Sequence, residues 1–188
     1  MTRARDNASL SSTLSTTEIG YLDGVTSAVQ TQLDAKLATA TASSTYAPLS
    51  LPTLTAPVVI SPEERWTVSA SAPTSTTNFD ADTQGVLYLT SNTSTDWTLN
   101  VRGSGSTTIN SKLTTGDSLT VSLIVTNSST AYKHTALTID GSAQTVKWSG
   151  GTAPSAGNAN AIDVYQFTII KTAATPTYTV FASQTKFA

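Results

Sequence analysis

The sequence predicts a mainly β protein: a C-terminal antiparallel β-sandwich, jelly-roll-like, preceded by a short helix. Two observations support this fold class. From Val58 onward, apolar and polar residues alternate with the period of half-buried strands, and about eight to nine such runs are separated by polar turns. Only residues 15–37 have apolar residues at helical spacing. A closed barrel is the alternative arrangement of the same strands.

Residues 1–14 are polar and show little periodicity. Arg3, Arg5 and Asp6 form a small charged cluster before the helix. Such a segment is either a frayed terminus or an anchor peptide that becomes ordered on a larger partner. We predict the anchor peptide.

The segment 15–37 is predicted to be a short helix that associates with copies of itself. Ser15 and Glu18 have the spacing of a capping box at its start. The apolar residues that form one seam along the helix are Leu22, Val25, Val29, Leu33 and Leu37. Because a helix this short is marginal in water, its seam needs a partner. The alternative is packing on the chain's own β-domain.

An extended linker is expected over residues 38–57, and the β-domain over residues 58–188. Pro48, Pro52 and Pro57 disfavour helix in the linker. Within the β-domain, Asp140 and Gly141 lie between two strand-like runs and predict a tight hairpin. The run 162–170 is apolar on both faces, which is typical of a central strand covered on both sides, for example by a second sheet and a neighbouring subunit.

The composition excludes several classes of function. The chain has 188 residues, of which 38% are hydrophobic and 12% charged, with a net charge of −2 and no cysteine. Its basic residues are scattered singly, which argues against nucleic-acid binding. The absence of cysteine excludes disulfides and thiolate metal sites. No apolar run is long enough to insert into a membrane.

The candidates for catalysis and metal binding are weak, so we predict no enzymatic activity, no cofactor and no metal. His134 is the only histidine; no G-x-S-x-G motif accompanies it, and the alternation places it opposite Leu137 and Ile139. A calcium-loop spacing occurs in the run 78–82, but Thr83 and Leu89 stand where Gly and Glu are required.

Aromatic residues are the remaining candidates for binding. Trp66 and Trp97 share strand faces with aliphatic residues and are predicted to be core residues. Trp148 precedes a loop, residues 149–160, that is rich in Gly, Ser and Asn. Trp148, Asn158 and Asn160 are therefore candidates for a surface contact. An exposed Trp148 beside a groove would favour a carbohydrate-binding module.

Two segments resemble bacteriophage proteins. TTEIGYLDGVTSAVQTQLDAK, followed by YAPLSLPTLTAPVVI, is similar to a segment that recurs in tail-fibre and other virion proteins, and KWSGGTAPSAGNANAIDVYQFTIIKT resembles C-terminal domains of phage structural proteins. The resemblance implies a trimeric coiled coil ahead of a β-domain. It also implies a homotrimer in the virion, attached to other virion proteins through its N-terminus. We predict a trimeric short tail fibre that projects from the particle and contacts a host glycan or protein. A head fibre and a capsid decoration protein are the alternatives.

Overall fold

The computed structural model describes residues 15–21, 28, 29, 31 and 65–188 of the chain. The chain divides into two compact units, Met1–Ile60 and Ser61–Ala188. The coiled-coil seam residues Leu22, Val25, Leu33 and Leu37, the anchor residues Arg3, Arg5 and Asp6, and the linker 38–57 lie outside the described residues.

In the first unit, helix α2 (Thr16–Gly20) begins at the predicted capping box. The Ser15 hydroxyl oxygen accepts a hydrogen bond from the Glu18 backbone N–H at 3.1 Å. The Glu18 carboxylate in turn accepts from the Ser15 backbone N–H at 2.7 Å and from its hydroxyl at 2.8 Å. These two bonds to Ser15 lower the pKa of Glu18. The capping-box prediction is confirmed.

The second unit is mainly β. Its strands are β1 (Trp66–Ser69), β2 (Thr76–Asp80), β3 (Val86–Asn92), β4 (Trp97–Arg102), β5 (Ser118–Thr126), β6 (His134–Ile139), β7 (Ser142–Gln144), β8 (Val146–Trp148), β9 (Ile162–Ala173) and β10 (Thr177–Phe187). Two short helical segments, α5 (Ile109–Lys112) and η1 (Ser149–Gly151), connect strands.

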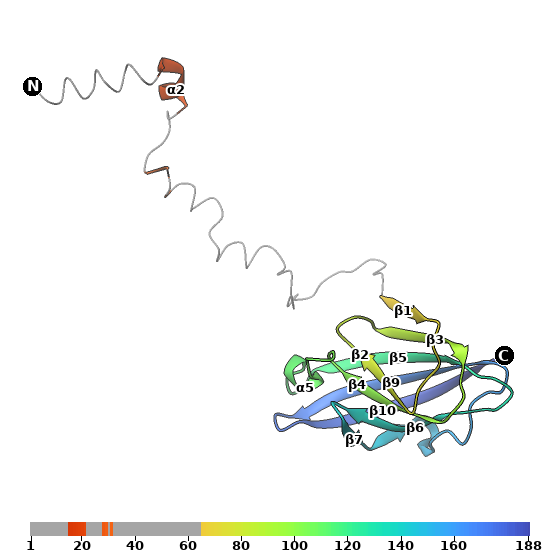
Figure 1. The fold of residues 1–188 in the computed structure, drawn as a ribbon. Coiled ribbons are helices and arrows are strands. Elements are labelled where there is room, and N and C mark those ends of the chain that lie inside the picture. The colour runs from red at the N-terminus through yellow and green to blue at the C-terminus, as the bar shows by residue number, and fades with distance from the viewer. Residues whose placement is uncertain (1–14, 22–27, 30, 32–64) are drawn as a thin grey trace, which may run out of the picture. The chain divides into compact units, whose positions relative to one another are not determined.

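The strands form two sheets (Figure 1). The six-stranded sheet has the order β1-β3-β5-β9-β10-β8, and the four-stranded sheet has the order β2-β4-β6-β7. From β1 to β6 the chain changes sheet after each strand, so that each strand pairs with the strand two places along. β6 and β7 form a hairpin, β8 then joins the six-stranded sheet at the outer edge of β10, and the long strands β9 and β10 lie side by side as a second hairpin (Figure 1).

The predicted antiparallel, jelly-roll-like pairing is wrong for most of the unit. The pairs β1–β3, β3–β5, β2–β4, β4–β6 and β8–β10 are parallel, whereas only β5–β9, β9–β10 and β6–β7 are antiparallel. The alternating path explains the four parallel pairs among β1 to β6, because a chain that crosses to the other sheet and back re-enters its first sheet in the same direction. Period-two alternation reports which residues face the core, not which way the neighbouring strand runs.

One core joins the two sheets. Phe79, Trp97 and Leu137 from the four-stranded sheet cluster with Leu123 and Phe167 from the six-stranded sheet, and all five are almost completely buried. The sheets therefore pack face to face, as in a sandwich. Strand β9 lies between β5 and β10, as its sequence predicted for a central strand.

The hairpin predicted at Asp140 and Gly141 is confirmed. It joins β6 to β7, with Ile139 paired to Ser142 across a two-residue loop. Both loop residues have positive φ, 50° for Asp140 and 80° for Gly141, as a hairpin turn of this kind requires. By contrast, β2 was missed because Phe79 is its only apolar residue, and β7 was missed because Ala143 is its only one.

Candidate functional site

The helical segment presents apolar side chains to solvent. Tyr21, which follows α2, is 78% exposed, and Val29, the one described member of the predicted seam, is 57% exposed. Both residues lie C-terminal to the capped helix α2, and Val29 is helical.

Trp148 ends β8 beside a shallow pocket. The pocket has a volume of about 400 Å³ and lies over strands β8, β9 and β10. The Trp148 ring itself is half-buried and packs inward, with its centroid 5.6 Å from that of His134 and 6.0 Å from that of Phe167. Trp148 is therefore anchored in the core cluster and offers only part of its surface to the pocket.

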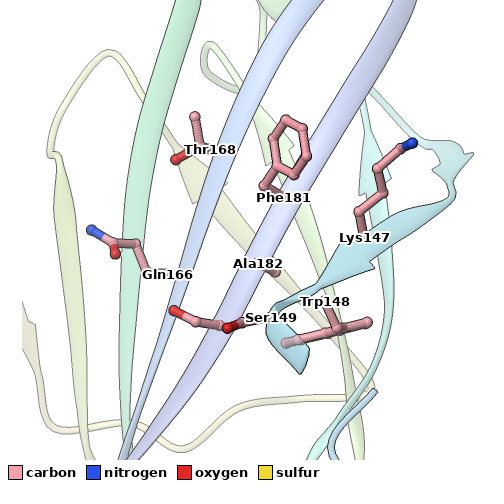
Figure 2. A pocket seen from close by; sticks show the side chains of 8 residues that line it. Lys147, Trp148, Ser149, Gln166, Thr168, Phe181 and Ala182 are labelled. Carbon is pink, nitrogen blue, oxygen red and sulfur yellow. The ribbon is translucent and has the colours of Figure 1, made fainter. Parts of the chain in front are cut away.

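The exposed aromatic residue of this pocket is Phe181, which the sequence analysis did not single out. Its side chain is 48% exposed. Figure 2 shows its ring on β10 between Thr168 of β9 and Lys147 of β8, with Gln166 farther along β9. An aromatic ring beside amide and hydroxyl groups can stack on a ligand ring and bond its polar substituents. The outward position of Phe181 in the alternation of β10 was the available signal.

The loop 149–160 is fastened to the β-unit along its second half. The Lys133 ammonium donates to the carbonyl oxygen of Pro154 at 3.2 Å. The Asn158 side-chain amide donates to the carbonyl of Phe187 at 3.1 Å, and the Asn160 backbone N–H donates to the carbonyl of Ser128 at 2.7 Å. Asn158 and Asn160 therefore have structural roles here, and their part in a surface contact stays a prediction.

A buried carboxylate, Asp163, lies where this loop meets β9. Its Oδ2 accepts hydrogen bonds from the Asn158 backbone N–H at 2.9 Å and from the Asn127 side chain at 2.8 Å. Within the described part of the chain its Oδ1 has no hydrogen-bond partner. Burial raises the pKa of Asp163, against the lowering effect of these bonds. This arrangement holds the loop to the start of β9.

His134 lies among aromatic rings. Its ring centroid is 5.1 Å from those of Trp97 and Phe167 and 6.0 Å from that of Tyr165. Burial lowers the pKa of His134 to about 4, so the imidazole is neutral near pH 7. Its neighbours offer packing rather than the nucleophile and carboxylate of a catalytic triad.

The predicted orientation of His134 is wrong. The side chain faces the core together with Leu137, not away from it. The register between β4 and β6 shifts there, because Trp97 pairs with His134 whereas Thr98 pairs with Ala136. The extra residue, Thr135, is a β-bulge that reverses the alternation by one position.

The two tryptophans predicted for the core differ. Trp97 is fully buried, as predicted, but Trp66 is 54% exposed. Trp66 lies on the edge strand β1 and pairs with Val86 of β3. Its side chain points to the outer face of the six-stranded sheet. Alternation along β1 correctly groups Trp66 with Val68 but does not say which of the two faces is covered.

The residues with calcium-loop spacing are engaged in other contacts. Asn78 accepts a hydrogen bond from Asn100 at 2.8 Å. Asp80 pairs with Arg102 at 2.6 Å, and Asp82 pairs with Lys112 at 2.5 Å. The hydrogen bond from Lys112 is the main cause of a lowered pKa at Asp82. Among the residues described, no group of three or more His, Cys, Asp or Glu is placed to hold a metal ion.

The comparisons with known proteins yield no match to a family model, to a curated protein or to a solved structure. In the described ranges, no helix has the length and apolar character needed to cross a membrane.

Proposed function

We propose that the protein is a non-enzymatic structural component of a phage virion: a homotrimeric short fibre that projects from the particle. The observation that carries the proposal is the capped helix α2, followed by exposed Tyr21 and Val29, in a compact unit that precedes the β-unit in the chain. The resemblance of the same segment to phage fibre sequences supports this assignment. A head fibre or a capsid decoration protein uses the same construction and is the alternative.

In this proposal each part of the chain has one task. Residues 1–14, with Arg3, Arg5 and Asp6, dock on other virion proteins. Residues 15–37 form a trimeric coiled coil, residues 38–57 are an extended linker, and the β-unit faces outward. Three β-units held together bind a repetitive surface more tightly than one, because the second and third contacts form at high effective concentration.

Light scattering on the full-length chain tests the assembly. The expected mass is three times the chain mass of 19.5 kDa. Val29→Asp should reduce it, because a charge in a symmetric seam faces only its own copies. Thr31→Asp, also at an exposed position but off the predicted seam, is the matched control and should leave the trimer intact. A monomeric wild-type chain at micromolar concentration would contradict the proposal.

Incorporation into particles tests the virion role. Removal of residues 1–14 should abolish incorporation and leave the soluble trimer unchanged. For host contact, Thr152→Lys with Ala153→Lys alters the exposed half of the loop without touching the anchored Asn158 and Asn160. Reduced adsorption to host cells supports a fibre, whereas unchanged adsorption favours the decoration protein.

A carbohydrate-binding module is the second candidate function, and the pocket beside Phe181 is the observation that favours it. Binding to a panel of neutral glycans should be lost in Phe181→Ala, because the stacking surface is removed. Phe187→Ala is the matched control, since Phe187 is an exposed aromatic residue on the same face of β10 outside this pocket. Equal binding by both variants would reject the site.

A further inference from the structure

The outer faces of the two sheets differ in chemistry. On the four-stranded sheet, the Asn100 side chain donates to Asn78 at 2.8 Å and accepts from the Thr138 hydroxyl at 2.8 Å, so that one polar row crosses three strands. The next outward pair along these strands is the ion pair between Asp80 and Arg102. A face whose polar side chains hydrogen-bond to one another is suited to contact with water.

The outer face of the six-stranded sheet carries a row of apolar side chains across its strands, where the four-stranded sheet carries a polar row. Val68 pairs with Tyr88, Tyr88 with Ile124, and Ile124 with Val164, so that four strands contribute neighbouring side chains. Val68 is 64% exposed, and the other three are half-buried. Trp66 lies two positions from Val68 on the same face and extends the row. We call this surface, Trp66, Val68, Tyr88, Ile124 and Val164, the apolar row.

The same face is almost free of charge. In β1, β3, β5, β9 and β10 the charged residues are Asp163, Lys171 and Lys186. All three lie at core-facing positions of their strands. Asp163 and Lys171 are buried, and Lys186 pairs with Asp163. The outward positions of these five strands therefore carry no charged side chain. Arg65 precedes β1, and Lys147 lies on β8 at the opposite edge of the sheet.

We propose that the apolar row is the surface through which the β-units of neighbouring copies of this chain pack together. A symmetric assembly brings a surface close to its own copies, and an uncharged face avoids the like-charge repulsion that this would otherwise cause. A charged partner of another kind would find no complementary charges on these strands. The charge pattern therefore fits a second copy of this uncharged face and disfavours a charged partner.

The entry point of the chain agrees with this occupant. β1, which carries Trp66 and Val68, is the edge strand through which the chain enters the β-unit from the segment of the proposed coiled coil. A coiled coil upstream would hold the β-units near one another at an effective concentration on the order of millimolar. The proposal goes beyond the proposed function by naming where the β-units meet, and the β-unit interface can be tested without the helix.

The first experiment is sedimentation equilibrium on the chain from Ser61 to Ala188. This unit contains the core and all strands of the described residues, so it is expected to fold alone. We expect concentration-dependent self-association below the millimolar range. Ile124→Lys should abolish it, because the new charge would be buried without a partner. Thr98→Lys is the matched control: it also lies on the outer face of a central strand, in the four-stranded sheet, and should leave association unchanged.

The second experiment uses the full-length chain, which has no cysteine of its own. Single variants Ile124→Cys and Thr98→Cys are reacted with a maleimide under native conditions. Both positions are half-buried in a single chain. Coverage by a second copy should slow labelling at position 124 by roughly tenfold or more relative to position 98.

Each outcome decides the matter. A β-unit that stays monomeric up to millimolar concentration overturns the proposal, as does equal labelling at the two positions. Slow labelling at position 124 in the full chain, combined with a monomeric β-unit, would mean that residues 1–60 of the same chain cover the apolar row. This result also overturns the proposal. Should Ile124→Lys fail to fold by circular dichroism, Val68→Lys on the exposed edge strand replaces it. A trimeric full chain with a monomeric β-unit rejects this inference and leaves the proposed function standing.

Discussion

The Asn127 side-chain Nδ2 donates a hydrogen bond of 2.8 Å to Asp163, and the Asn127 side-chain Oδ1 accepts one from the Thr93 hydroxyl at 2.5 Å. All three side chains are buried. This row joins the end of β3, the end of β5 and the start of β9, and through the Asn158 backbone it reaches the loop that follows η1.

Removal of the middle partner should be costly. Asn127→Ala leaves the Thr93 hydroxyl without its acceptor and removes a donor from Asp163, so we expect a loss of about 1–3 kcal/mol in the free energy of unfolding. Urea denaturation measures it. Asn92→Ala, at an exposed position on β3, should change stability by less than about 0.5 kcal/mol. Equal effects of the two substitutions would contradict this role of Asn127.

Gly157 is the position in the loop least tolerant of a side chain. A Cβ atom there would overlap the carbonyl oxygen of Tyr132 and lie 2.7 Å from Asn127 Nδ2 and 2.8 Å from Asp163 Oδ2. Because backbone must move, Gly157→Ala should lower the free energy of unfolding by about 3 kcal/mol. Gly85→Ala meets no atom within 4 Å and serves as the control. Near-identical melting temperatures for the two variants would show that the loop backbone moves to accommodate the Cβ atom at little cost in stability.

Asp140 supports both the hairpin and α5. Its carboxylate accepts from the backbone N–H groups of Ile109 at 2.8 Å and Asn110 at 3.1 Å. Asp140→Ala loses both bonds and places alanine at positive φ, so it should lower stability by about 1–2 kcal/mol in thermal or urea unfolding. Asp140→Asn keeps an acceptor and tolerates the backbone conformation, so its loss should be smaller. A larger loss for asparagine would contradict the capping role.

His134 should make the protein sensitive to mild acid. Its pKa is lowered by burial from 6.5 to about 4, so the unfolded chain binds a proton at a pH where the folded chain does not. The contribution of His134 is therefore fully present above pH 6.5 and is lost as the pH falls toward 4. The total loss is on the order of 3 kcal/mol.

The comparison of wild type with His134→Phe isolates this effect, because other titrating groups are common to both. Their free energies of unfolding, measured by urea denaturation, should run parallel between pH 7 and 8. Below pH 6.5 the wild type should lose stability relative to the variant. Curves that stay parallel down to pH 4 would show that the folded protein accommodates the charged imidazole, which would contradict the prediction.

Several features follow from short-range chemistry and were predictable from the sequence. The Ser15–Glu18 capping box and the Asp140–Gly141 turn depend on residues close together in the chain, and the structure has both. The interior faces of β4, β5 and β9 follow from period-two alternation, because a half-buried strand must direct alternate side chains into the core.

Other features depend on which segments meet, and only the tertiary structure decided them. The parallel pairs among β1 to β6 arise because the chain crosses between sheets after each of these strands, a path that no local pattern encodes. Trp66 is exposed because its side chain points to the outer face of the sheet, and His134 is buried because the Thr135 bulge shifts the alternation. The Phe181 pocket, the Asp163 contacts and the apolar row likewise join residues from distant strands. Alternation assigns a side chain to one face of a strand, but the partner strands determine what that face meets.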